Sequence, residues 1–234
     1  YRQSSLVESE QLAKDPENHW LTRQARYRLD AEMIRDNALA ISGLLVRDVG
    51  GTSVKPYQPA GYWAYLNFPT RQWKSGQGDD LYRRGLYVHW QRQYLHPSLL
   101  AFDAPSREEC TADRSRSNTP LQSLVLLNDP TFVEAARVFA QRVLTNGDGD
   151  DAERLQWAFE QALHRHPTAE EAEILLSLLR RQLEGYKANQ NAAQELASVG
   201  DYPSAADLNP AEFAACISTK ESPTKREEFK SIFL

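Results

Sequence analysis

Cysteine is scarce in this chain of 234 residues: there are only two, Cys110 and Cys216, and they lie far apart. Two cysteines cannot build the disulfide framework of a small secreted scaffold, although one bridge between them stays open. No Cys-x-x-Cys-His sequence occurs, so this chain cannot attach a c-type haem through the usual motif.

The motifs GxGxxG, GxxxxGK[ST], GxSxG and HExxH are also absent, so the sequence shows no standard nucleotide, hydrolase or metalloprotease site. No apolar run approaches the ~20 residues that a membrane-spanning helix needs. The net charge of −5 argues against a general nucleic-acid binder, which needs a basic surface. No secretion signal is visible, but the chain starts at Tyr1 rather than at Met, so we expect an N-terminal part before it.

The composition that remains is typical of a soluble globular protein, with 41% hydrophobic and 25% charged residues. We predict a mainly α fold: an irregular multi-helix domain with long aromatic-rich loops and a small C-terminal helical bundle. Residues 1–128 would form the N-terminal part of the domain and residues 129–215 its helical lobe. Residues 216–234 read as a polar tail that departs from the helical pattern, and our hypothesis is a shifted reading frame or an artificial end near Ala215.

In the first part of the chain the pattern predicts helices and a loop. Asp15-Pro16-Glu17 is typical of a helix start. We expect a further helix to continue through Gly43 and to end at Gly50-Gly51, with a Pro-containing loop over 50–59. Its apolar stripe has helical spacing: Ile34, Ala38, Ile41 and Leu45.

An aromatic-rich stretch and a flexible linker over 75–78 precede an amphipathic segment. Over residues 80–94 the spacing of apolar residues favours a helix, with a strand over 86–90 as the alternative.

The block of residues 102–132 carries two helix starts. Thr119 caps a short helix, Pro120 occupies its first position, and Gln122 closes a capping box. We expect this helix to be buried, because it is apolar on most sides: Leu121, Leu124, Val125, Leu126 and Leu127. Asn128 or Asp129 then caps the next helix, with Pro130 at its first position.

Helical patterns with short connections follow and predict the small bundle. Two apolar faces define its first helices: Phe132, Ala136, Phe139 and Val143, then Leu155, Phe159, Ala162 and Leu163. A capping box formed by Thr168 and Glu171 starts the next helix. Asn209-Pro210 is a good start for the last one.

A group of arginines is the first candidate site: Arg83, Arg84, Arg107, Arg114 and Arg116. Acidic residues stand near them in sequence: Asp103, Glu108, Glu109 and Asp113. Guanidinium groups form paired hydrogen bonds with carboxylates, or with bound sulfate, phosphate or uronate groups. We favour an internal ion-pair network that fixes irregular loops, and a site for an anionic ligand is the alternative.

Aromatic residues and one thiol provide further candidates. Trp63 and Trp90 could stack on sugar faces, although packing in the core is the interpretation that we favour. Cations near Cys110 could lower its pKa and make the thiol reactive, whereas a plain buried thiol is our preferred reading.

Two segments resemble metal sites but fall short of them. His164 and His166 are too few ligands on their own, and we expect a loop between helices there. Residues 146–151 place oxygen ligands at alternate positions, but the required glycine is missing and Trp157 replaces the bidentate glutamate of a calcium loop. We assign no metal ligand, and the catalytic residues stay unknown.

Four sequence pieces together are specific: RQARYRLDAEMIRD (23–36), GGTSVKPYQP (50–59), YRRGLY (82–87) and the block with SNTPLQSLVLLNDP (117–130). With them the chain resembles, from about Tyr1 to Ala215, the C-terminal domain of large secreted planctomycete-type proteins, the DUF1553 or PSD1 family. In that family the YRQSS sequence lies inside the domain, which implies that the chain begins within it. No catalytic residue carries over.

The resemblance implies an extracytoplasmic bacterial protein, periplasmic or on the cell surface, in which DUF1549 and c-type cytochrome modules often precede this domain. Haem c would belong to those upstream modules, and we expect no cofactor in this chain. We therefore expect an accessory or docking domain whose partners are upstream modules of the same polypeptide, with an anionic polysaccharide or a cytochrome as further candidates.

Two alternative functions stay open: an enzyme that acts on complex or sulfated polysaccharide, and a redox-partner recognition domain. A cleft with two facing carboxylates would favour the enzyme, and an apolar patch rimmed by charges would favour docking.

Overall fold

The computed structural model of the protein describes residue 4 and residues 9–25, 28–65, 72–91, 94–146, 149–205 and 207–219. Within these ranges the chain forms nine α-helices and three 3₁₀ turns, and the prediction of a mainly α fold is confirmed. The α-helices are α1 (Ser9–Lys14), α2 (Ala31–Ser42), α3 (Pro97–Ala101), α4 (Pro120–Asn128), α5 (Pro130–Asn146), α6 (Asp151–Leu163), α7 (Ala169–Ala188), α8 (Gln190–Ala197) and α9 (Pro210–Ser218). The 3₁₀ turns are η1 (Tyr62–Tyr65), η2 (Gly78–Leu81) and η3 (Gly85–Tyr87).

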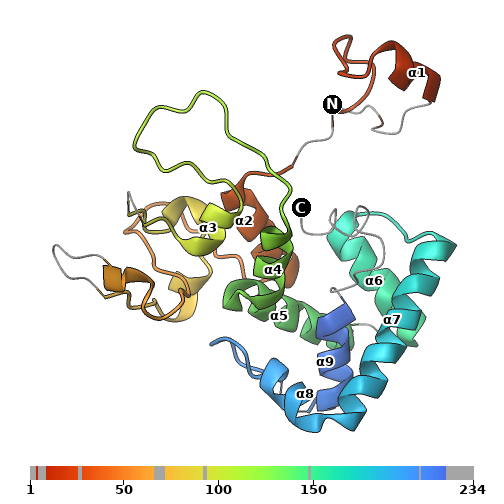
Figure 1. Ribbon diagram of the computed structural model, residues 1–234. Coiled ribbons are helices and arrows are strands. Elements are labelled where there is room, and N and C mark those ends of the chain that lie inside the picture. The colour runs from red at the N-terminus through yellow and green to blue at the C-terminus, as the bar shows by residue number, and fades with distance from the viewer. Residues whose placement is uncertain are drawn as a thin grey trace.

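Helix α5 connects the two halves of the molecule (Figure 1). Helices α2 and α4 pack against it on the N-terminal side, and α3 packs on both of them. Helices α6 and α9 pack against it on the C-terminal side, where α7 and α8 complete the group. Helix α1 lies apart from both groups in this view.

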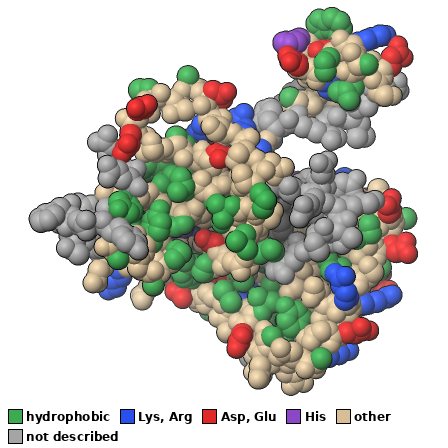
Figure 2. All heavy atoms as spheres, viewed as in Figure 1, with side chains coloured by type: hydrophobic (Ala, Val, Ile, Leu, Met, Phe, Trp, Pro, Cys, Tyr) green, Lys and Arg blue, Asp and Glu red, His purple; other side chains and the backbone are tan. Residues whose placement is uncertain are grey.

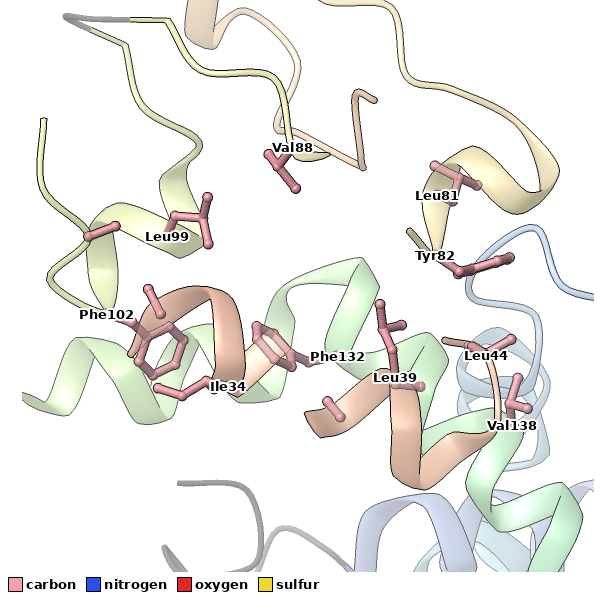
Figure 3. Packing of buried hydrophobic residues seen from close by; sticks show 14 of the residues in the cluster. Ile34, Leu39, Leu44, Leu81, Tyr82, Val88, Leu99, Phe102, Phe132 and Val138 are labelled. Atoms are coloured by element: carbon pink, nitrogen blue, oxygen red, sulfur yellow. The ribbon is translucent and has the colours of Figure 1, made fainter. Parts of the chain in front are cut away.

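Two apolar clusters share α5 as a common wall. The larger one, shown in part in Figure 3, contains Phe132 and Val138 of α5 beside Ile34 and Leu39 of α2. The smaller one joins Ala136 and Ala140 of α5 to α9. A helix with apolar residues on most sides needs cover on most sides, and α5 has that cover from both groups.

Helix α2 ends earlier than the sequence suggests. Gly43 has φ +85 and donates its N–H to the carbonyl of Ala40, while the N–H of Leu44 reaches the carbonyl of Leu39. These two bonds form a Schellman motif, which needs the left-handed conformation that glycine adopts without strain. The predicted continuation through Gly43 is therefore wrong.

The helix start expected at Asp15 is also wrong, because α1 ends one residue before it. The Asp15 carboxylate instead accepts the N–H groups of His19 at 2.8 Å and Trp20 at 2.9 Å. A side chain that bonds its own following backbone in this way stabilises a turn.

The described residues of the range 80–94, which leave out 92–93, do not form the predicted helix. They contain the end of η2, then η3, and an isolated parallel bridge between Val54 and Val88. Arg35 of α2 donates at 2.6 Å to the carbonyl oxygens of Leu81 and Arg83, so these carbonyls are not free for helical bonds. At Gly85, a Cβ atom would lie 2.9 Å from Glu32 Cβ, which explains why this turn can approach α2.

The helix starts predicted at Thr119, Asp129, Thr168 and Asn209 are confirmed. Thr119 with Gln122 and Thr168 with Glu171 form the two capping boxes, and Asn209 caps α9. Asp129, rather than Asn128, bonds the first turn of α5, through the N–H of Thr131 at 2.9 Å. Local sequence is sufficient for such motifs because all partners lie within a few residues.

Helix α9 continues through Cys216 to Ser218, with Ile217 and Ser218 buried. The expected boundary at residue 216 therefore falls inside a helix, and residues 220–234 lie outside the described part of the chain.

His96, next to α3, is 2% exposed, and both of its ring nitrogens have a hydrogen-bond partner. Its Nε2 lies 2.6 Å from the Tyr57 carbonyl, which can only accept, so Nε2 carries the proton. Its Nδ1 then accepts from the Ser98 hydroxyl at 2.8 Å. Burial lowers the pKa of His96 to about 4.

We predict that His96 makes the fold sensitive to acid. Since the folded pKa lies below the unfolded value of about 6.5, its contribution is complete above that pH and is lost as pH falls toward 4, by about 3 kcal/mol. Urea denaturation of the wild type and His96→Gln between pH 7 and pH 4.5 measures this. The free energy of unfolding should fall less steeply for the variant; equal slopes would contradict the assignment.

Candidate functional site

Three of the predicted arginines gather at the start of α2. Arg114 lies 2.8 Å from Glu32 and 3.6 Å from Asp30, Arg116 lies 3.7 Å from Asp30, and Arg107 lies 3.8 Å from Glu32. We call these five residues the α2 charge cluster. The partners are thus Glu32 of α2 and Asp30, the residue before it, not the acids that lie near these arginines in sequence. The arginine side chains stay 33–46% exposed, so solvent weakens each pair.

The segment that carries these arginines is a closed loop. The Asp103 carboxylate accepts the N–H of Ser117 at 2.7 Å and its hydroxyl at 2.8 Å, which joins the two ends. The loop extends from the body of the molecule between α3 and α4 (Figure 1). Arg107 covers the ring of Trp90 at 3.7 Å from its centroid, and the Trp90 indole N–H donates to the Ser106 carbonyl at 3.2 Å.

Arg83 belongs to a different environment. It donates to the carbonyl oxygens of Asp48, Gly50 and Thr52 and lies over the ring of Tyr87 at 4.0 Å. Arg83 therefore holds the loop before Val54 through backbone carbonyl groups, whereas the favoured interpretation had expected carboxylate partners.

Arg84 lies near Asp36 of α2, whose pKa is raised by burial although Arg84 counteracts this rise. Asp36 also accepts the N–H of Gly85 at 2.6 Å. Arg84 is thus placed beside α2, but on the turn that η3 forms rather than in the α2 charge cluster.

Trp63 is too deeply buried to stack on a sugar. Trp63 is 4% exposed, lies edge-on to Trp73 at 5.0 Å, and is covered by the Lys55 ammonium at 5.6 Å. It packs the interior, as the favoured alternative proposed. Trp90 is half-buried, and Arg107 already occupies one face of its ring.

Cys110 is exposed on the closed loop, so the expectation of a buried thiol is wrong. Both Cys110 and Cys216 are free, and the bridge that the sequence left open is not formed.

The histidine pair does lie in a connection between helices. His164 ends α6 with φ +55, and His166 lies 2.6 Å from Glu160. Arg165 bonds Glu171 at 2.7 Å, and this contact lowers the pKa of Glu171 to about 2. Asp150 of the acidic turn caps α6. In the described part of the chain no three His, Cys, Asp or Glu side chains gather as metal ligands.

The sequence did not reveal a buried charge network on α5. Glu134 and Arg137 are each 1% exposed and lie 3.8 Å apart. Glu134 accepts the Tyr82 hydroxyl at 2.9 Å and the N–H of Tyr202 at 2.7 Å, and it also bonds the Tyr57 hydroxyl. With Tyr57, Tyr82 and Tyr202, this pair forms what we call the Glu134 network.

The Glu134 network also fixes the connection between α8 and α9. Arg137 donates to the carbonyls of Val199 at 2.8 Å and Tyr202. At Gly200, with φ +91, a Cβ atom would lie 2.2 Å from the Glu134 carboxyl carbon, so only glycine fits. Burial, followed by the Glu134 charge, raises the pKa of Tyr57 and Tyr82. The available signal was a Glu and an Arg at spacing i, i+3 within an otherwise apolar helix face.

Helix α4 is not buried, although its apolar sequence had predicted this, and its exposed side bears on function. Its side toward the core holds Gln122, which is 1% exposed, but the opposite side presents leucines to solvent. Together with a neighbour on α3 they form the α4 leucine face: Leu100 (56% exposed), Leu121 (55%), Leu124 (56%) and Leu127 (40%). Figure 2 shows hydrophobic side chains over α3 and α4.

The α4 leucine face begins beside charged residues. Arg28 donates to the Gln122 side chain at 2.6 Å, and Gln122 also bonds Ser117 at the end of the closed loop. The first turn of α4 is therefore tied to the segments that carry the α2 charge cluster. The exposed leucines thus lie on a helix whose N-terminal end is joined to a charged loop, and an exposed apolar patch of this kind is typical of protein interfaces.

None of the described helices is long and apolar enough to cross a membrane. The fold and these contacts define an irregular helical domain that is held together by buried and half-buried ion pairs. The chain belongs to the PSD1 family, described as a protein of unknown function (DUF1553), whose sequence profile matches residues 1–179. The match ends inside α7, earlier than the resemblance had suggested. No curated protein matches the chain, and no solved structure does.

We predict that the Glu134 network is essential for stability. Glu134→Gln keeps the size of the side chain but leaves the buried Arg137 charge uncompensated, which should lower the free energy of unfolding by about 3–5 kcal/mol. Urea denaturation measures the change. The matched control is Glu173→Gln on the exposed side of α7, where we expect less than about 0.5 kcal/mol; similar losses in both variants would refute the assignment.

Proposed function

We propose that this chain is an accessory docking domain of an extracytoplasmic multidomain protein, and that its α4 leucine face seats another module of the same polypeptide. The exposure of Leu121 and Leu124 is the observation that carries this proposal. The family membership supports the extracytoplasmic setting and the presence of neighbouring modules, through the resemblance to proteins in which cytochrome and DUF1549 modules precede this domain.

The shape of the face favours a protein partner. Leu121, Leu124 and Leu127 repeat every three residues, so they form a ridge that is inclined to the axis of α4 and turns by about 120° around it. A stripe of this kind fits one partner helix or a flat apolar surface, as helices bind in apolar grooves. Because burying leucine side chains removes apolar area from water, association with such a surface is favourable.

The charged end of the face would orient the partner. Arg114 and Arg116 are exposed enough to contact a second protein while they keep their carboxylate partners on α2. Charges at the border of an interface mainly fix orientation and increase the rate of association.

The geometry gives less support to glycan recognition. Every arginine of the α2 charge cluster already faces Asp30 or Glu32, so an anionic sugar would have to compete with fixed carboxylates. Trp63 is buried and Trp90 is covered by Arg107 on one face. Docking is therefore the function that these contacts support best.

Hydroxyl-radical footprinting tests the proposal by comparing this chain alone with the longer polypeptide. Oxidation of Leu121, Leu124 and Leu127 should fall severalfold in the longer polypeptide, because a seated module excludes the radical. Val49, which is 84% exposed on the loop that Arg83 holds, serves as the reference and should react equally in both.

A substitution pair makes the test specific. In the longer polypeptide, Leu121→Ser/Leu124→Ser should release the module and return the oxidation of Leu127 to the value of the isolated chain, whereas Val49→Ser should leave Leu127 protected. Equal oxidation in both forms of the protein would overturn the proposal. Protection that instead rises with the concentration of the isolated chain would identify a second copy as the occupant and would also overturn it.

A further inference from the structure

A cavity of about 130 Å³ lies between α5, α6, α7 and α9, away from the α4 leucine face. Helix α6 packs against α5 and α7, and the cavity lies where its inner side faces α9. Its walls are mainly apolar: Val143, Leu144, Leu155, Leu179, Leu183 and Ala215.

Small residues of α9 explain why space remains there. Ala215 and Cys216 face the cavity, and neither fills the gap between α9 and α6. Burial raises the pKa of Cys216 to about 12, so its thiol is neutral at physiological pH and adds a further weakly polar wall. Along these apolar walls water finds few hydrogen-bond partners, although the cavity is partly open to solvent.

The charged residues of the cavity are unequal in sign. Asp151 and Arg154 come from the first turn of α6, and Glu212 comes from the first turn of α9. Two carboxylates and one guanidinium leave a net negative border, which attracts a hydroxyl or ammonium group and repels a carboxylate.

We propose that this cavity is a binding site for a small amphiphile: one six-membered ring, or a short branched chain of similar size, that carries a hydroxyl or an ammonium group. The ring would contact Leu155, Leu179 and Leu183, and the polar group would lie at Asp151 and Glu212. The size agrees, since an engineered apolar cavity of about 150 Å³ in another protein accepts benzene. Ligand sites of this type commonly lie between helices and combine apolar walls with a few polar groups.

The ring contacts can be separated from nonspecific binding by filling the cavity. Leu179→Phe and Leu183→Phe each add volume at a side chain that already lines the space. Leu86→Phe, on η3, adds the same ring on the exposed surface and is the matched control. Two filling variants are needed because either one alone could disturb the packing of α7, which thermal unfolding of each variant will show.

The probes are benzyl alcohol, benzylammonium and benzoate, titrated into the full 234-residue chain. Calorimetry gives the affinities, and the methyl resonances of Leu155 and Leu183 locate the bound ring. We expect saturable binding of benzyl alcohol and benzylammonium, with benzoate about tenfold weaker or more, which is a difference of about 1.4 kcal/mol. Glu212→Gln should reduce the preference for benzylammonium over benzyl alcohol.

The affinity of the cavity-filling variants for benzyl alcohol tests whether the ring binds in the cavity. A folded Leu179→Phe or Leu183→Phe chain should bind benzyl alcohol about tenfold more weakly or worse, while Leu86→Phe should bind like the wild type. Unchanged affinity in a folded filling variant would overturn the proposal. So would the absence of any saturable shift at Leu155 and Leu183 in the wild type, or binding of benzoate as tight as that of benzylammonium.

Discussion

The rest of the structure depends on one buried ion pair, Glu134 and Arg137 on α5. Two charges removed from water require hydrogen-bond partners, and α5 alone cannot supply them; the surrounding segments bond all the polar atoms of the pair except Arg137 Nη1. Tyr57 and Tyr82 come from the loops of the N-terminal half, and Val199 and Tyr202 from the connection before α9. Satisfying this pair therefore brings together segments from both sides of α5, and it explains why the two apolar clusters share this helix.

Features that depend on neighbouring residues were predictable from the sequence. The capping boxes at Thr119 and Thr168 and the start of α5 need only residues within one turn. Features that depend on distant partners were not. Residues 80–94 have an amphipathic pattern, but Arg35 takes two of their carbonyl groups and Gly85 lies against Glu32, so tertiary contacts override the helical preference.

In the candidate site, too, the residues were predictable from the sequence but their distant partners were not. Sequence identified the arginines and predicted that they serve structure, yet it placed their partners among nearby acids, whereas Asp30 and Glu32 lie more than seventy positions earlier in the chain. It identified α4 as an apolar helix but not the direction of its exposed side. Burial of a helix is decided by what the rest of the chain places around it, and here α3 and α5 cover only the side of Gln122. The surface that results combines unpartnered leucines with charges that are already neutralised, which suits contact with a protein better than capture of an anion.

The connection between α8 and α9 determines where this domain can be divided. The family profile ends at residue 179, yet the backbone groups of Val199 and Tyr202 that bond Arg137 and Glu134 lie beyond that point. A fragment trimmed to the matched residues would keep both buried charges and lose these partners, together with α9, which closes the smaller apolar cluster. The part of the chain that must fold together is thus longer than the part that matches the family profile. It has to include the backbone groups that bond Glu134 and Arg137.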